Sequence, residues 1–213
     1  MSKIAVLTIS KREGWEELAK QSIEKQTVQL DKWIVITDQD VKKIRASNLN
    51  RSLNYGLKQC LDVDYVIFYQ DFIELQPDCF EKLIALADER TFVTTCTPNY
   101  DGSDDGRYTH VDGPRACLPA EWETNVAIAP MAVLRELGGF DEEYDNGWAW
   151  DNVNVAERAA MLGCRFIIDE SNRPKLLPHE QTSKLELELN ADRHAATMKA
   201  IREGKKPLRL SYL

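Results

Sequence analysis

Charged and hydroxyl side chains stand at the points where three apolar segments of the sequence end. They are Ser10 and Arg12 after residues 4–9, Asp38 after residues 33–37, and Asp71 after residues 65–69. A guanidinium such as that of Arg12 can form charge-assisted hydrogen bonds with diphosphate oxygens, although a solvated surface cation has the same signature. A carboxylate at the end of a buried strand can bind a polar ligand or a hard cation, and it can equally cap a turn. These positions predict a ligand site built from three strand ends.

A second candidate is the carboxylate of Asp151, which lies beside two tryptophans. Asp151 can accept a proton from a hydroxyl, whereas its neighbour Asn152 cannot. The indole rings of Trp148 and Trp150 offer flat faces for the C–H groups of a ligand, and they are also ordinary core residues. Because Asp151 directly precedes a predicted helix, it can be a simple N-cap. The sequence favours the base and leaves the cap open.

Short β-branched segments alternate with longer helical patterns in the first half of the chain. The predicted strands are 4–9, 33–37, 65–69 and 92–96, and the predicted helices are 15–26, 41–60 and 77–87. This alternation predicts an α/β fold with a mostly parallel central sheet flanked by helices. Ligands of such sheets bind at the carboxyl ends of the strands, which is where the candidate residues above stand.

The second half begins with a long segment, 97–124, that is rich in Asp, Gly and Pro. Such a loop is typically a lid, a binding loop or disordered. The pattern then predicts strands at 125–129 and 165–169 and helices at 131–137, 152–162 and 191–203, the last capped by Asn190. Gly138-Gly139 predicts a helix end with positive φ, followed by close packing. By itself, the acidic run at 141–145 is typical of a solvated turn.

Composition excludes several classes of protein. Of the 213 residues, 43% are hydrophobic and 29% charged, and 27 Lys and Arg against 35 Asp and Glu give a net charge of −8. These values exclude wholesale disorder, and the acidic balance argues against non-specific nucleic-acid binding. Five cysteines without a C-x-x-C pair predict reduced thiols. With no signal-peptide layout and no apolar run of about 18 residues, we expect a cytoplasmic protein without a transmembrane segment.

Three segments together resemble the GT-A glycosyltransferases of the family-2 type. The first is the strand that leads into Ser10-Lys11-Arg12, with Asp38 following the next strand. The second is LNYG at 53–56 with DYVIFYQD at 64–71, which is similar to "LNxG…DyivflDxD". The third is GGFDE at 138–142 with WAWDN at 148–152, Arg158 and Gly163, which is similar to "GGFDE…WxxED…R…G". The resemblance covers most of residues 4–169, and its third segment is the most specific.

The resemblance implies a single GT-A (Rossmann-like) domain with three parts: a nucleotide-binding half at 1–96, an acceptor and catalytic half at 97–180, and a C-terminal helix and tail at 181–213. It implies transfer of one sugar from a nucleotide-diphospho-sugar, with UDP as leaving group, to an acceptor hydroxyl with inversion. The implied nucleotide and diphosphate contacts are Ser10, Arg12, Asp38, Asn54 and Arg158; the sugar or acceptor contacts are Trp148, Trp150 and Asp141; the base is Asp151; and the metal ligands are Asp71 and His179. No Q-x-x-R-W motif is present, which implies a non-processive enzyme.

The predicted metal site departs from the family pattern, because the D-x-D positions hold Gln70-Asp71-Phe72. With one carboxylate, a Mn²⁺ or Mg²⁺ ion needs another protein ligand such as His179, which is otherwise a surface histidine on a turn. A metal-free variant stays open. So do two other functions, a catalytically inactive nucleotide-sugar-binding module and a nucleotidyltransferase, although the loop after the first strand is poor in glycine. The acceptor can be a glycan, a protein, a small molecule or a modified nucleic acid.

Overall fold

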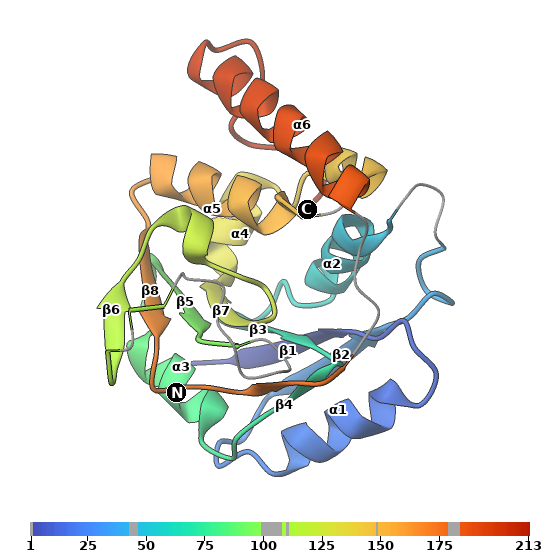
Figure 1. Ribbon diagram of the computed structural model, residues 1–213, viewed down its shortest axis with the longest axis vertical. Coiled ribbons are helices and arrows are strands. Elements are labelled where there is room, and N and C mark those ends of the chain that lie inside the picture. Colours follow the sequence, from blue (N-terminus) through green and yellow to red (C-terminus); the bar gives the residue numbers. More distant parts are fainter. Residues whose placement is uncertain (1, 43–46, 99–107, 110, 148, 179–183) are drawn as a thin grey trace.

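The centre of the protein is a seven-stranded sheet to which both halves of the chain contribute (Figure 1). The computed structural model describes residues 2–42, 47–98, 108–109, 111–147, 149–178 and 184–213, with side chains at 184–188 excepted. The strand order is β2-β1-β3-β7-β5-β8-β6. The strands are β1 (Ile4–Ile9), β2 (Lys32–Ile36), β3 (Tyr65–Gln70), β5 (Thr91–Thr95), β6 (Pro114–Ala116), β7 (Val126–Pro130) and β8 (Arg165–Asp169). Five of them run in one direction, and β6 and β7 run antiparallel to their neighbours, so the predicted mostly parallel sheet is confirmed.

Helices cover both faces of this sheet (Figure 1). They are α1 (Trp15–Glu24) and α3 (Cys79–Leu86) on one face, and α2 (Leu49–Lys58), α4 (Met131–Leu137) and α5 (Asp151–Met161) on the other. The central strands are buried on both faces, which explains why β1 and β3 are largely apolar rather than alternating. The last helix, α6 (Lys184–Arg202), lies outside α5 and contacts the short 3₁₀ helix η2 (Glu142–Asn146).

Glycines of the LNYG and GGFDE motifs let neighbouring segments pack closely. A Cβ at Gly56 would collide with Leu7, so glycine lets α2 approach β1. Gly138 and Gly139 have φ of 73° and 87°, and a Cβ on Gly138 would meet the main chain of Leu210. The predicted helix end with positive φ and close packing is therefore confirmed.

Several predicted boundaries are wrong in the structure. Helix α2 begins at Leu49 rather than near residue 41. Helix α6 begins at Lys184, so Asn190 lies inside the helix and is not its cap. The long segment 97–124 contains β6 and a 3₁₀ helix, η1 (Pro119–Glu121). A two-stranded sheet of β4 (Ile73–Glu74) and β9 (Lys175–Leu176) was also not predicted. These elements are short or depend on distant partners, which local periodicity does not report.

Candidate functional site

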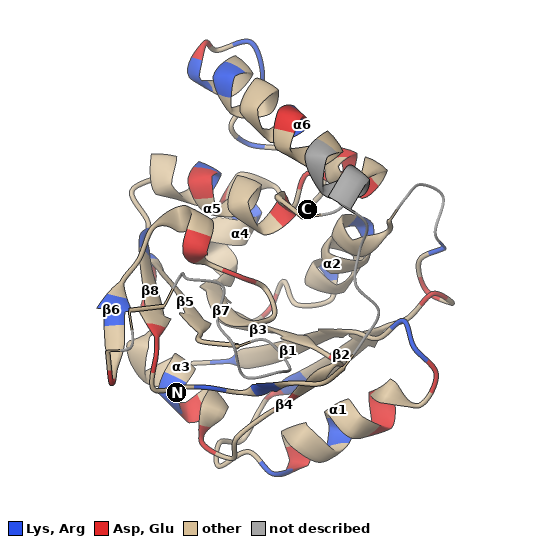
Figure 2. Cartoon of the chain, viewed as in Figure 1, with Lys and Arg blue, Asp and Glu red and all other residues tan. Residues whose placement is uncertain are grey.

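The residues predicted at the three strand ends lie together. We call Ser10, Lys11, Arg12, Asp38 and Asp71 the strand-end cluster. Strand β1 pairs with β2 on one side and β3 on the other, and Ile9 is in register with Ile36 and Gln70. The segment after β1 therefore lies between those that follow β2 and β3. Figure 2 shows the basic Lys11–Arg12 segment next to the acidic turn after β2, at the right of the view.

Asp71 is the buried member of the strand-end cluster, with 1% of its side chain exposed. Its Oδ2 accepts a hydrogen bond from the Ser10 hydroxyl at 3.0 Å, and its Oδ1 lies 3.4 Å from Nη1 of Arg12. The carboxylate is thereby joined to both predicted diphosphate contacts. This ion pair compensates a buried negative charge that would otherwise be costly.

Asp38 is the exposed member of the cluster and is held from two sides. Its Oδ1 lies 3.1 Å from Nζ of Lys11 and accepts a hydrogen bond from the Asn48 side chain, also at 3.1 Å. Lys11 also donates to the hydroxyl of Ser52 in α2. An exposed carboxylate at the rim of the strand ends can accept hydrogen bonds from a base or a ribose.

Asp151 is the first residue of α5 and is only 6% exposed. Burial raises the pKa of its carboxyl to about 6; the nearby charges of Asp145 and Glu123 add to the shift, and backbone N–H groups at the helix start partly offset it. No described basic side chain forms an ion pair with it. A carboxylate with this pKa is ionised at neutral pH and has an increased affinity for a proton, as a general base requires.

The residues before Asp151 are in a strained conformation that α6 supports. Ala149 and Trp150 both have positive φ, 59° and 67°, which is unusual for residues with side chains. The side-chain amide of Asn190 donates to the carbonyl oxygen of Ala149 at 3.0 Å. The ring of His194 stacks on Trp150 at a centroid distance of 5.1 Å. Helix α6 thus fixes the backbone from which Asp151 projects.

One short segment, 122–125, joins the surroundings of Asp151 to those of Asp71. The carbonyl oxygen of Trp122 accepts a hydrogen bond from Asn152, 2.7 Å away. The carbonyl oxygen of Asn125 accepts one from the backbone N–H of Gln70, 2.9 Å away. Three residues span at most about 10 Å, so Asp151 lies near the carboxyl end of β3, where Asp71 follows.

Asp145 joins η2 to the start of α2, and this role was not predicted from the sequence. It is fully buried and accepts hydrogen bonds from the backbone N–H groups of Asn50 and Arg51 at the start of α2. Asp141 is also buried and accepts a hydrogen bond from Lys206. The prediction of a solvated turn is therefore wrong for these two acids, because their partners are distant in the sequence.

Two residues predicted to contact the nucleotide serve as internal connections. Asn54 exchanges hydrogen bonds with the backbone of Phe140, joining the LNYG motif to GGFDE. The guanidinium of Arg158 is buried and donates to the carbonyl oxygens of Leu137, Gly139 and Leu208. These contacts give Arg158 a structural role in holding the C-terminal segment, and its contact with a diphosphate stays a prediction.

Two predicted residues, Trp148 and His179, lie outside the described residues. The described chain before this gap reaches the strand-end cluster, because the backbone N–H of Leu177 donates to the carbonyl oxygen of Phe72. The described residues contain no group of three or more His, Cys, Asp or Glu that could hold a metal ion. With Asp71 joined to a guanidinium and Phe72 at the second acidic position, this part of the site does not fit a hard cation, which needs several oxygen ligands.

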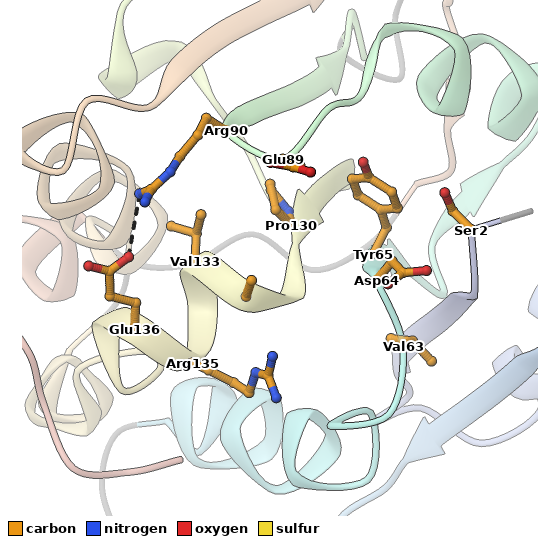
Figure 3. A pocket seen from close by; sticks show the side chains of 11 residues that line it. Ser2, Val63, Asp64, Tyr65, Glu89, Arg90, Pro130, Val133, Arg135 and Glu136 are labelled. Carbon is orange, nitrogen blue, oxygen red and sulfur yellow. Dashed lines mark hydrogen bonds and ion pairs between the residues drawn. The ribbon is translucent and has the colours of Figure 1, made fainter.

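A cavity of about 710 Å³ lies at the amino ends of the parallel strands, away from the strand-end cluster (Figure 3). It is lined by residues that precede the parallel strands, such as Asp64 before β3 and Arg90 before β5. Its lining carries charges of both signs, including the ion pair of Arg90 with Glu136. The strand-end cluster and Asp151 do not contribute to it.

No protein-family model matches the sequence, and no curated protein matches it. Among solved structures, GalNAc-T7 with UDP, GalNAc and Mn²⁺ is similar over 100% of this chain, with a TM-score of 0.69 and 13% identity. TarS of S. aureus is similar over 82% of this chain, with a TM-score of 0.60 and 13% identity. The catalytic domain of Drosophila β1,4-galactosyltransferase 7, in complex with xylobiose, is similar over 90%, with a TM-score of 0.60 and 14% identity.

These likenesses show the fold. The protein has the GT-A fold of these glycosyltransferases, as the sequence motifs predicted. The chain covers 52% of the GalNAc-T7 chain, 60% of the TarS chain and 80% of the galactosyltransferase chain. No helix in the described part of the chain is long and apolar enough to cross a membrane.

Proposed function

We propose that this protein is a glycosyltransferase that moves one sugar from a nucleoside-diphosphate sugar to an acceptor hydroxyl, with UDP as leaving group. The GT-A fold supports the reaction class, and UDP is present in the structure of the similar GalNAc-T7. The strand-end cluster supports a donor site, because it combines a guanidinium, a hydroxyl and an exposed carboxylate at the carboxyl ends of β1, β2 and β3.

The observation that carries the proposal is the buried carboxylate of Asp151 near the carboxyl end of β3, where Asp71 follows. In the proposed reaction, Asp151 takes the proton of the acceptor hydroxyl as the acceptor oxygen attacks the anomeric carbon. The new C–O bond forms as the bond from that carbon to the diphosphate oxygen breaks, and UDP leaves with the bonding electrons. A single displacement of this kind inverts the anomeric carbon and adds one sugar at a time.

The donor contacts follow from the positions of the strand-end cluster. Arg12 and Ser10 contact the diphosphate, and Asp38 accepts hydrogen bonds from the uracil or the ribose. Trp150, next to the base, offers an indole face to a sugar ring. The acceptor class stays open between a glycan, a protein, a small molecule and a modified nucleic acid.

The resemblance also implies a divalent cation, and Mn²⁺ is present in the GalNAc-T7 structure. In this chain its ligands would be Asp71 and His179, and its chemistry would be to neutralise the leaving diphosphate. Since the described residues do not fit such an ion, no step of the proposed reaction depends on it.

A direct test is to incubate the protein with a panel of UDP-sugars and to measure the slow release of UDP. We expect release with at least one sugar, and we expect it to disappear in Asp151→Asn but to persist in Asp192→Asn, which changes an exposed acid on α6. Gln70 and Phe72 at the metal motif favour a second candidate, an inactive nucleotide-sugar-binding module. Binding of UDP without release from any sugar would support that module and contradict the enzyme.

A further inference from the structure

Arg12 places a permanent positive charge beside the one acidic residue of the Gln70-Asp71-Phe72 segment. Its Nη1 lies 3.4 Å from Asp71, and 33% of the Arg12 side chain is exposed. The carboxylate itself is buried, so the pair presents its cationic member toward solvent. An anionic ligand approaching Asp71 therefore meets the guanidinium before the carboxylate.

Two aromatic rings hold this guanidinium in place. Cζ of Arg12 lies 5.2 Å from the centroid of the Trp15 ring and 5.3 Å from that of the Phe72 ring. Both distances are within the range of cation–π attraction, and a flat guanidinium stacks on aromatic faces in a way that an ammonium does not. The backbone supports the arrangement, because the N–H of Trp15 donates to the carbonyl oxygen of Arg12.

Phe72 occupies one of the two positions where the D-x-D motif has a carboxylate. With two carboxylates and a divalent cation, the local charge sums to zero; with Asp71 and Arg12, it also sums to zero. The side chain that replaces the second acid is one of the two that hold the guanidinium. Gln70 holds the other acidic position, so Asp71 at the middle position is the only carboxylate of this segment. One carboxylate in place of two and a fixed internal cation thus fit one another.

A divalent cation on Asp71 would have to displace Arg12 or approach it closely, and like charges at such distances repel. A guanidinium also has its own means of binding phosphate, since its planar set of N–H donors matches pairs of phosphate oxygens. Arg12 therefore combines the charge and the donor geometry that a leaving diphosphate requires.

We propose that Arg12, held between Trp15 and Phe72 and paired with Asp71, takes the place of the divalent cation at the diphosphate. The protein then binds a nucleoside diphosphate without metal. This inference rests on the proposed donor site, and it concerns how the diphosphate charge is neutralised rather than which sugar is transferred.

The test is calorimetric titration of the whole protein with UDP, in EDTA and in Mn²⁺. We expect the two dissociation constants to agree within about threefold, and Mn²⁺ alone to give no binding heat. Arg12→Ala should weaken UDP binding in EDTA by about 10- to 100-fold, which corresponds to the loss of hydrogen bonds to a charged group. Arg12→Lys should recover part of the loss, because it keeps the charge but not the planar donors.

Arg135→Ala is the matched control, because it removes one exposed arginine of the cavity at the amino ends of the parallel strands (Figure 3) and should leave UDP binding unchanged. Circular dichroism confirms that each variant is folded. UDP binding that needs Mn²⁺ and is indifferent to Arg12→Ala would overturn the inference and leave the proposed glycosyltransferase intact. Failure of UDP and every other nucleoside diphosphate to bind, with or without Mn²⁺, would overturn both.

Discussion

Asp71 and Asp151 are the same residue type near the same end of β3, and both are buried, yet their surroundings differ. Asp71 lies after β3 beside a hydroxyl and a guanidinium. Asp151 starts α5 with acidic groups as its electrostatic neighbours, and burial raises its pKa to about 6. One carboxylate therefore holds a cation, whereas the other has an increased affinity for a proton.

Under the proposed function, this difference gives the two regions of the site different chemistry. A carboxylate compensated by Arg12 keeps its charge and positions a group that binds anions. A desolvated carboxylate near other acids takes up a proton more readily, which suits it to deprotonate a hydroxyl. Exchanging the two environments would exchange the roles, so variants at the two positions should behave in opposite ways.

The largest expected effect is on turnover in Asp151→Asn. Asparagine keeps the size of the side chain but cannot accept the proton, so the rate of sugar transfer should fall by about 10²- to 10⁴-fold. The dissociation constant of UDP should stay within about twofold of the wild-type value, since Arg12 is untouched. The rates come from UDP release and the constants from calorimetry. Equal losses in turnover and in UDP affinity would contradict the separation of roles.

The same substitution should stabilise the folded protein at neutral pH. The carboxyl pKa is about 6 in the folded state, against an ordinary value of 3.8 for an aspartate exposed to water. The stabilising contribution of Asp151 is present below pH 3.8 and is lost as the pH rises through 6. Ionised Asp151 then costs up to about 3 kcal/mol, which Asp151→Asn removes.

Asp71→Asn is the control for this stability measurement, and it should change the free energy of unfolding in the opposite direction. It removes the charge that compensates Arg12 and weakens the bond from Ser10, so the free energy of unfolding should fall by about 1 kcal/mol. Urea unfolding at pH 7.5 measures both variants. Changes of the same sign would show that the two carboxylates do not differ as described.

The pH dependence of kcat/KM should also report the ionisation of Asp151. Because the base acts in its ionised form, kcat/KM should decline as the pH falls through about 6, and should be about tenfold lower one unit below that pKa. Binding of an intact UDP-sugar to Asp151→Asn should not follow this curve, because its diphosphate, unlike the terminal phosphate of UDP, has no group that titrates near pH 6. An acid limb near pH 4 would indicate a solvated carboxylate as the base.

The smallest effect should come from the support of the Ala149-Trp150 backbone by α6. Asn190→Ala removes the hydrogen bond to Ala149 and should lower kcat by about three- to tenfold. UDP affinity should not change, because Asn190 contacts the backbone just before Asp151 and not the strand-end cluster. Asp192→Ala, on the exposed face of the same helix, is the control. A loss of UDP affinity that accompanies the loss of kcat would indicate general damage to the fold.

Much of the fold could be predicted because its elements are long, apolar on both faces and bounded by clear breakers. Strand β1, helix α4 and strand β8 have the predicted bounds. Strand β6 was missed because it is a short, largely exposed edge strand that begins at Pro114. The start of α6 was missed because the strict Leu-Glu alternation at 185–189 does not have helical periodicity.

The candidate site was predictable where a residue follows a strand, since topology alone brings Ser10, Arg12, Asp38 and Asp71 together. It was not predictable where a role depends on distant partners. Nothing local distinguishes Asp145, buried beneath the start of α2, from its exposed neighbours. Likewise, the side-chain amide of Asn190 donates to the carbonyl oxygen of Ala149, 41 positions away in the chain.

The most direct test of the shared site is a crystal structure of the protein with UDP. We predict that the diphosphate lies against Arg12 at the ends of β1 and β3, with the uracil toward Asp38 and the Asp151 carboxylate facing the terminal phosphate from the α5 side. UDP bound in the cavity beside Arg90 and Glu136, or Asp151 directed away from the diphosphate, would contradict it.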